Sequence, residues 1–79
     1  MPLPAGIELR IFRELDVNTL KISVYKNRMH VGFLLGYKNH RNKTVSCYPS
    51  KGLVAGTFGP RELPITRRID ELPWERKEG

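Results

Sequence analysis

The sequence predicts a mainly β fold: a small antiparallel sheet or partly open barrel of four or five strands, with one short C-terminal helix. Three observations lead to this prediction. Apolar and polar residues alternate over residues 7–11 and again over residues 20–37, which is the pattern of half-buried strands. Residues that favour turns separate these runs. The period lengthens only after Pro64, and a helix there would make the class α+β.

The length of 79 residues predicts one small basic domain over residues 1–79, with frayed ends at 1–6 and 75–79. A domain of this size buries only about 60% of the surface that its unfolded chain exposes, so its stability is marginal. Self-association into a homodimer would add buried area. No stretch approaches the roughly 20 apolar residues of a membrane span, and we therefore expect no membrane partner.

The first strand is predicted at residues 7–11, where Ile-Glu-Leu-Arg-Ile alternates apolar and charged side chains. Pro2 and Pro4 disfavour regular structure before it, and Gly6 leads into it. Residues 16–19, Asp-Val-Asn-Thr, are predicted to form a turn, because Asp and Asn side chains bond readily to nearby backbone groups.

Residues 20–37 carry the clearest signal, a β-hairpin. Two alternating runs flank the polar break at residues 26–28, whose Asn27 tolerates the positive φ of a tight turn. Continuous alternation predicts a core face made of Leu20, Ile22, Val24, Met29, Val31, Phe33 and Leu35. The opposite face would carry Lys21, Ser23, Tyr25 and His30, with Gly32 and Gly36 leaving its far end bare.

The second half of the chain is predicted to contain a loop, two short strands and a helix. The polar and basic residues 38–43 form the loop, residues 44–48 a third strand, residues 49–52 a turn, and residues 53–58 a fourth strand. A helix of about two turns is predicted from Pro64, because Ile65, Ile69 and Leu72 fit one stripe and Pro73 stops the run. Arg67 and Arg68 are expected to pair with nearby acidic residues.

Charge is strongly segregated along the chain. Residues 17–61 contain no Asp or Glu and eight Lys or Arg, whereas residues 1–16 and 62–79 each carry a net charge of −1, so that −1 + 8 − 1 gives the total of +6. A basic surface of this kind attracts polyanions. Solubility alone requires charge but does not require a long segment without acids.

Aromatic residues lie beside these cations, which is a combination suited to single-stranded nucleic acid, because rings stack on bases and cations neutralise phosphates. Tyr25 is the tyrosine best placed for this, whereas Tyr37 and Tyr48 are predicted to be amphipathic residues at the edge of the core. The predicted binding residues are Lys21, Tyr25, Lys26, Arg28, His30, Lys38, His40, Arg41 and Lys43.

No catalytic pattern stands out, and we expect a protein that is not an enzyme. His30 and His40 could together cleave RNA without a metal, as general base and general acid, but neither has an obvious carboxylate to orient it. The single cysteine, Cys47, has no accompanying nucleophile motif and is expected to be a buried apolar residue. Neither the spacing of zinc ligands nor a phosphate-binding glycine pattern is present, so no metal or cofactor is expected.

The leading functional prediction is a non-catalytic nucleic-acid-binding module that uses the basic sheet face and the 38–43 loop. The alternative is a small regulatory or inhibitory protein, of the kind that phages and mobile elements encode, which binds an acidic protein surface. A metal-independent ribonuclease is the third reading. The charge pattern alone does not separate DNA, RNA and an acidic protein as partners. One unpaired cysteine and an N-terminus without a signal-peptide pattern predict a cytoplasmic protein.

Overall fold

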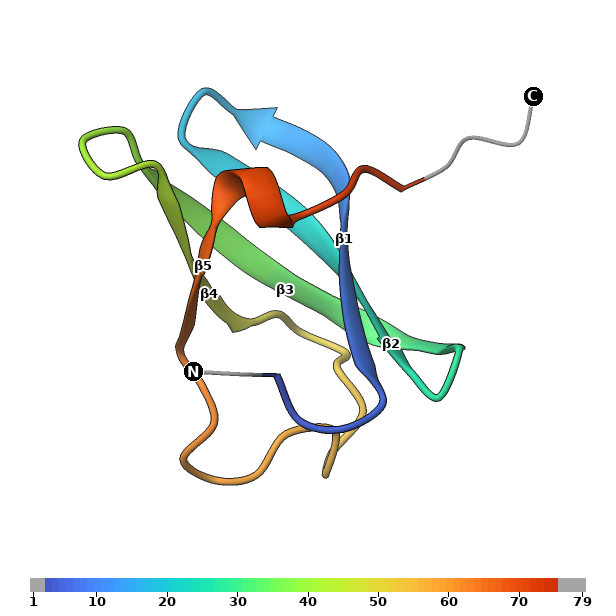
Figure 1. The fold of residues 1–79 in the computed structure, drawn as a ribbon. Coiled ribbons are helices and arrows are strands. Elements are labelled where there is room, and N and C mark those ends of the chain that lie inside the picture. The colour runs from blue at the N-terminus through green and yellow to red at the C-terminus, as the bar shows by residue number, and fades with distance from the viewer. Residues whose placement is uncertain (1–2, 76–79) are drawn as a thin grey trace.

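The computed structural model describes residues 3–75. Within this range the chain forms five antiparallel strands in the order β1-β2-β3-β4-β5, each paired with the next one along the chain (Figure 1). Their bounds are β1 Ile7–Asp16, β2 Thr19–Lys26, β3 Met29–Asn39, β4 Thr44–Pro49 and β5 Ile65–Arg68. The prediction of a mainly β fold with a small antiparallel sheet is therefore confirmed.

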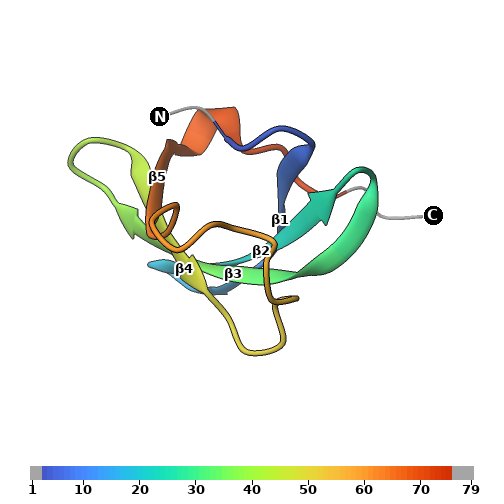
Figure 2. The same cartoon turned by 90° about the horizontal axis from the view of Figure 1, so that it is seen from below.

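The sheet is curled, and the segment after β5 spans its open side. The 3-10 turn η1 (Ile69–Glu71) leads from β5 toward β1, where Trp74 forms an isolated parallel bridge with Ile11. The Ile11 N–H donates to the Pro73 carbonyl over 2.7 Å, and the Glu75 N–H donates to the Ile11 carbonyl over 2.7 Å. Seen from below, the strands and this segment surround a common interior (Figure 2).

The core fills this interior. It consists of one cluster of buried apolar side chains from all five strands and from the segment after η1: Ile7, Leu9, Ile11, Leu20, Ile22, Val24, Leu34, Val45, Cys47, Ile65 and Leu72. The alternation predicted for the first two strands places Leu9, Ile22 and Val24 in the core, as observed. The opposite side of β1–β4, which we call the outer face, carries the residues that alternate with these.

The predicted core face of the hairpin is wrong in β3. A β-bulge at Val31 leaves that residue without a partner, because Tyr25 pairs with His30 while Val24 pairs with Gly32. One extra residue reverses the side on which each later side chain lies. Leu34 is consequently buried, and Phe33 and Leu35 lie on the outer face and are only half-buried. Met29 precedes the bulge and is 70% exposed because it lies at the start of β3, beside the turn.

Gly36 lies on the inward face of β3 at a position where a larger residue would not fit. A Cβ atom at this position would lie 2.5 Å from Val45 Cγ1 and 2.7 Å from Ile22 Cδ1. The Ile22 side chain of β2 and the Val45 side chain of β4 therefore pack over the backbone of β3 at Gly36. The prediction placed Gly36 on the solvent face, but it lies on the core face, where the absence of a side chain leaves room for these two residues.

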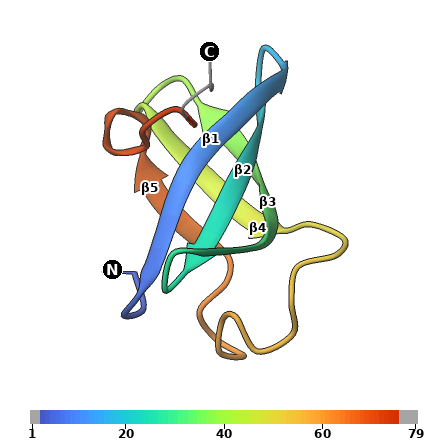
Figure 3. The same ribbon diagram turned by 90° about the vertical axis from the view of Figure 1, so that its right-hand side faces the viewer.

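The prediction for the C-terminal half is partly wrong. The predicted helix begins as β5, which pairs with β4, and only η1 is helical. The predicted fourth strand at residues 53–58 is an irregular loop that projects beyond the sheet (Figure 3). The Ser50 and Val54 N–H groups donate to the Phe33 and Val31 carbonyls of β3, at 3.2 and 2.9 Å, so the start of this loop follows β3 without forming a strand.

Glu75, the first residue of the predicted frayed end at 75–79, is hydrogen-bonded to Ile11. Residues 1–2 and 76–79 of the predicted frayed ends lie outside the described residues. No helix in the described part of the chain is long and apolar enough to cross a membrane.

Candidate nucleic-acid interface

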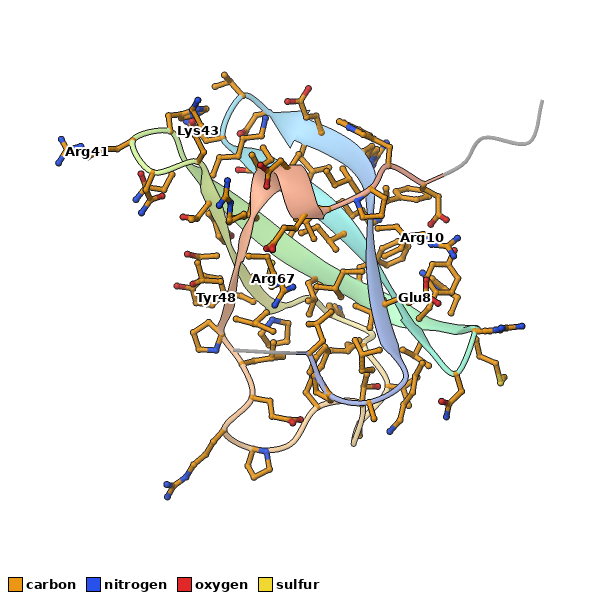
Figure 4. The ribbon with its side chains drawn as sticks, in the orientation of Figure 1. Glu8, Arg10, Arg41, Lys43, Tyr48 and Arg67 are labelled. Atoms are coloured by element: carbon orange, nitrogen blue, oxygen red, sulfur yellow. The ribbon has the colours of Figure 1, made fainter. Side chains whose placement is uncertain are left out.

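The nine predicted binding residues fall into two groups. Tyr25 and His30 lie on the outer face close to the β2–β3 turn, beside Lys26 and Arg28, and Lys21 lies on the same face nearer the start of β2, opposite Leu35. The remaining four, Lys38, His40, Arg41 and Lys43, lie at the far end of β3 and in the β3–β4 loop. In Figure 4, Arg41 and Lys43 of the second group lie in the loop at the upper left, far from Glu8 and Arg10 of β1 at the right.

Two residues of the first group, Tyr25 and His30, line a concave site on the outer face, which we call the outer hollow. Its volume is about 540 Å³, and its lining consists of Arg10, Phe12, Ser23, Tyr25, His30 and Phe33, with Glu75 from the C-terminal segment. Ser23 lies on the outer face but is only 1% exposed, because the larger side chains around it cover it. This volume is within the range of small-molecule sites in proteins.

The aromatic rings of the outer hollow contact one another edge to face. Phe33 lies 5.3 Å from Phe12 and 4.8 Å from His30, and His30 lies 5.2 Å from Tyr25, all measured between ring centroids. The Lys21 ammonium lies 4.2 Å from the Phe33 ring centroid. Such contacts hold rings in place, so a ligand would meet a pre-formed surface of rings and cations.

Arg10 and Glu75 complete this site, and neither is among the binding residues predicted from the sequence. The Tyr25 hydroxyl lies 2.9 Å from each carboxylate oxygen of Glu75, and Arg10 Nη1 lies 3.4 Å from Glu75 Oε1. The Arg10 guanidinium also lies 4.7 Å from the Tyr25 ring centroid and forms an ion pair with Glu8. Arg10 was not predicted because it lies outside the acid-free segment. Glu75 was not predicted because its contact with Tyr25 depends on the pairing of residues 73–75 with Ile11, and no local sequence pattern encodes that pairing.

The pKa values of Glu75 and Tyr25 are both shifted in this cluster. Burial of the Glu75 carboxylate acts to raise its pKa, but the hydrogen bonds from Tyr25 and Arg10 outweigh that effect, and the pKa is lowered. The hydrogen bond to Glu75 raises the pKa of the Tyr25 phenol. At neutral pH Glu75 is therefore an anion, and Tyr25 is a protonated donor that points at it.

The second group is largely engaged in contacts within the protein. Lys38 Nζ lies 2.6 Å from Glu14 Oε2, so this lysine is neutralised by an acid from outside the acid-free segment. His40 Nε2 lies 2.8 Å from Asn18 Oδ1. Arg41 and Lys43 are exposed in the loop, where Lys43 adopts a φ of 59°.

His30 and His40 do not form a joint catalytic site. Ten residues of extended β3 separate them, which corresponds to on the order of 30 Å. A general acid and a general base must both reach one phosphodiester, and these two imidazoles cannot do so. Cys47 is fully buried, and among residues 3–75 no group of three His, Cys, Asp or Glu side chains comes together in a way that could hold a metal.

Tyr37 and Tyr48, which were predicted to be amphipathic residues at the edge of the core, lie on the outer face next to the buried Gly36 and Cys47. They are 46% and 43% exposed, and their rings meet edge to face with 5.7 Å between centroids. Tyr48 also lines a second hollow of about 420 Å³, formed with the 50–64 loop. Its lining among the described residues is uncharged, with Leu53, Phe58 and Pro64 among its members, and it contains none of the predicted binding residues.

The pairing expected for Arg67 and Arg68 is confirmed. Arg67 lies 3.8 Å from Glu71, and Arg68 lies 3.2 Å from Asp70. Arg67 extends from β5 toward the middle of the curled sheet (Figure 4), so it does not enlarge the outer basic surface.

Comparison of the chain with models of known families, with curated proteins and with solved structures finds no match.

Proposed function

We propose that the protein is a non-catalytic, single-stranded nucleic-acid-binding protein whose binding site is the outer hollow together with the adjoining basic turn of residues 26–28. The observation that carries this proposal is the gathering of the Phe12, Tyr25, His30 and Phe33 rings on one sheet face, with the Lys21 ammonium over two of them, Phe12 and Phe33. Exposed rings on a sheet stack bases of any sequence, and adjacent cations neutralise the phosphates.

The chemistry of the lining supports a single strand over a duplex. Bases can stack on a ring only when they are unpaired and can leave their neighbours, whereas a duplex presents mainly phosphates and groove edges. A duplex would be held chiefly by exposed cations such as Arg41 and Lys43, and these lie at the other end of the sheet from the rings.

Binding of matched single-stranded and double-stranded oligonucleotides, measured by fluorescence anisotropy, tests this proposal. We expect tighter binding of the single strand. The Phe33→Ala variant should bind about tenfold more weakly, because a stacked base contributes roughly 1–3 kcal/mol. Tyr48→Ala is the matched control, since it removes an exposed ring that lies on the outer face but does not line the outer hollow. This variant should bind like the wild type.

Absence of affinity for every oligonucleotide at low salt would reject this proposal. The alternative, a regulatory protein that binds an acidic protein surface, would then account for the basic charge. Its signature is capture of a partner from a lysate that persists after nuclease treatment and depends on a few anchor residues.

A further inference from the structure

The outer hollow already contains an anion that belongs to the protein. The Glu75 carboxylate accepts hydrogen bonds from the Tyr25 hydroxyl at 2.9 Å and from Arg10 at 3.4 Å, and its side chain is only 20% exposed. A hydroxyl and a guanidinium are also the donors that bind phosphate oxygens. Glu75 therefore occupies the place that a ligand phosphate would take.

We propose that Glu75 is an intramolecular competitor at this site, and that a nucleotide phosphate binds Arg10 and Tyr25 by displacing the Glu75 carboxylate. This inference rests on the proposed function. In the free protein Arg10 is shared between two carboxylates, those of Glu8 and Glu75. A phosphate can use this cation fully only after Glu75 has moved away.

The attachment of the C-terminal segment allows this exchange. Leu72 is buried in the core at 7% exposure, whereas Trp74 is 60% exposed. Among residues 73–75, two backbone hydrogen bonds with Ile11 and the Glu75 side chain hold the segment to the sheet. Glu75 can accordingly leave the hollow while Leu72 stays in place and the core remains intact.

The occupant has a defined consequence for affinity. A site whose open state is only partly populated binds its ligand more weakly by that fraction. Removing the competitor raises the open fraction, and the gain appears as tighter binding without any new contact to the ligand.

The test compares the affinity of full-length wild type, Glu75→Ala and Glu75→Gln for a single-stranded oligothymidylate. Glu75→Ala should bind about fivefold more tightly or better, within the usual range of coupling between sites. Glu75→Gln keeps the size of the side chain and should lie between the two. Asp70→Asn is the charge-matched control, because it removes one exposed carboxylate next to Arg68, and it should stay within about twofold of the wild type.

The outcomes separate this inference from the proposed function. If the wild type binds and Glu75→Ala binds no more tightly than Asp70→Asn, the competitor role is wrong while nucleic-acid binding stands. If neither the wild type nor any variant binds, the proposed function fails and the inference falls with it. A tyrosine titration checks the contact itself, because loss of Glu75 should lower the raised pKa of Tyr25.

Discussion

The Tyr25 hydroxyl lies 2.9 Å from both carboxylate oxygens of Glu75, a residue fifty positions further along the chain. This contact connects the strand face that carries the predicted binding residues to the segment that spans the open side of the sheet. It places an acid in the centre of a site that is otherwise aromatic and basic. The lining of the outer hollow therefore includes residues outside the acid-free segment, Glu75 among them.

The face assignment of β3 can be tested with two neighbouring residues. Leu34 is fully buried and Phe33 is half-buried on the outer face. Leu34→Ala should lower the free energy of unfolding by about 2–5 kcal/mol, whereas Phe33→Ala should cost only about 1 kcal/mol and act mainly on binding. Urea denaturation measures both. If Phe33→Ala lost more stability than Leu34→Ala, the assignment of Phe33 to the outer face would be wrong.

Gly36 should not tolerate a side chain. In Gly36→Ala the new methyl group would press against Val45 and Ile22, and overpacking of this kind costs about 1–3 kcal/mol. Gly59→Ala is a suitable control, because its Cβ would approach only the flexible carboxylate of Glu62. Thermal unfolding should show a lower midpoint for Gly36→Ala alone, and equal midpoints would contradict the close approach of β2 and β4.

The salt dependence of binding should report how many of the cations near the outer hollow contact phosphates. If three or four of Arg10, Lys21, Lys26 and Arg28 contact phosphates, the slope of log K against log salt should be roughly −2 to −3 for a single strand. Arg28→Asn should reduce its magnitude by about 0.7 and weaken all sequences alike.

Lys43→Asn is the matched control for Arg28→Asn. Both residues are exposed cations with positive φ, at 59° for Lys43 and 69° for Arg28, and asparagine is well tolerated in this conformation. The loop variant should leave the slope unchanged. An equal effect of the two substitutions would show that the ligand contacts both ends of the sheet.

Cys47 should be unreactive in the folded protein. Burial raises the pKa of its thiol from the ordinary value of 9.0 to about 12, and nearby Arg67 lowers it only in part. The thiolate is the reactive form, so iodoacetamide at pH 8 should modify the unfolded chain in urea and leave the native chain nearly untouched. Rapid alkylation of the native protein would contradict the burial.

The same shift has a consequence for stability. The folded state holds the thiol proton more tightly than the unfolded state does, so the contribution is complete below pH 9.0 and is lost as the pH rises toward about 12. The part of the stability that Cys47 contributes should therefore stay constant from pH 7 upward and begin to fall only above pH 9.

Much of the sheet could be predicted from the sequence, because the alternation is regular in β2 and in the first half of β1, residues 7–11, and because Asn27 marks the turn between β2 and β3. The bulge at Val31 could not, since both faces of β3 carry apolar residues and alternation gives no sign of the extra residue. For β5, a four-residue strand followed by one 3-10 turn has nearly the same apolar spacing as a short helix.

The candidate site was predictable only in part. Lys21, Tyr25 and His30 share a face because strand periodicity puts them there. The contacts that draw Lys38 to Glu14 and Glu75 to Tyr25 join residues far apart in the chain, and local patterns do not encode such pairs. Charge segregation in the sequence therefore overstated the number of cations that are free to bind a partner.

The most direct test of the account is to map where a single-stranded oligonucleotide binds, by following the amide and aromatic NMR signals of the full-length protein during a titration. We predict that the largest shifts occur at Lys21, Tyr25, His30 and Phe33, with smaller changes at Arg28. Shifts confined to the loop that carries Arg41 and Lys43, or no shifts at any ligand concentration, would contradict the account.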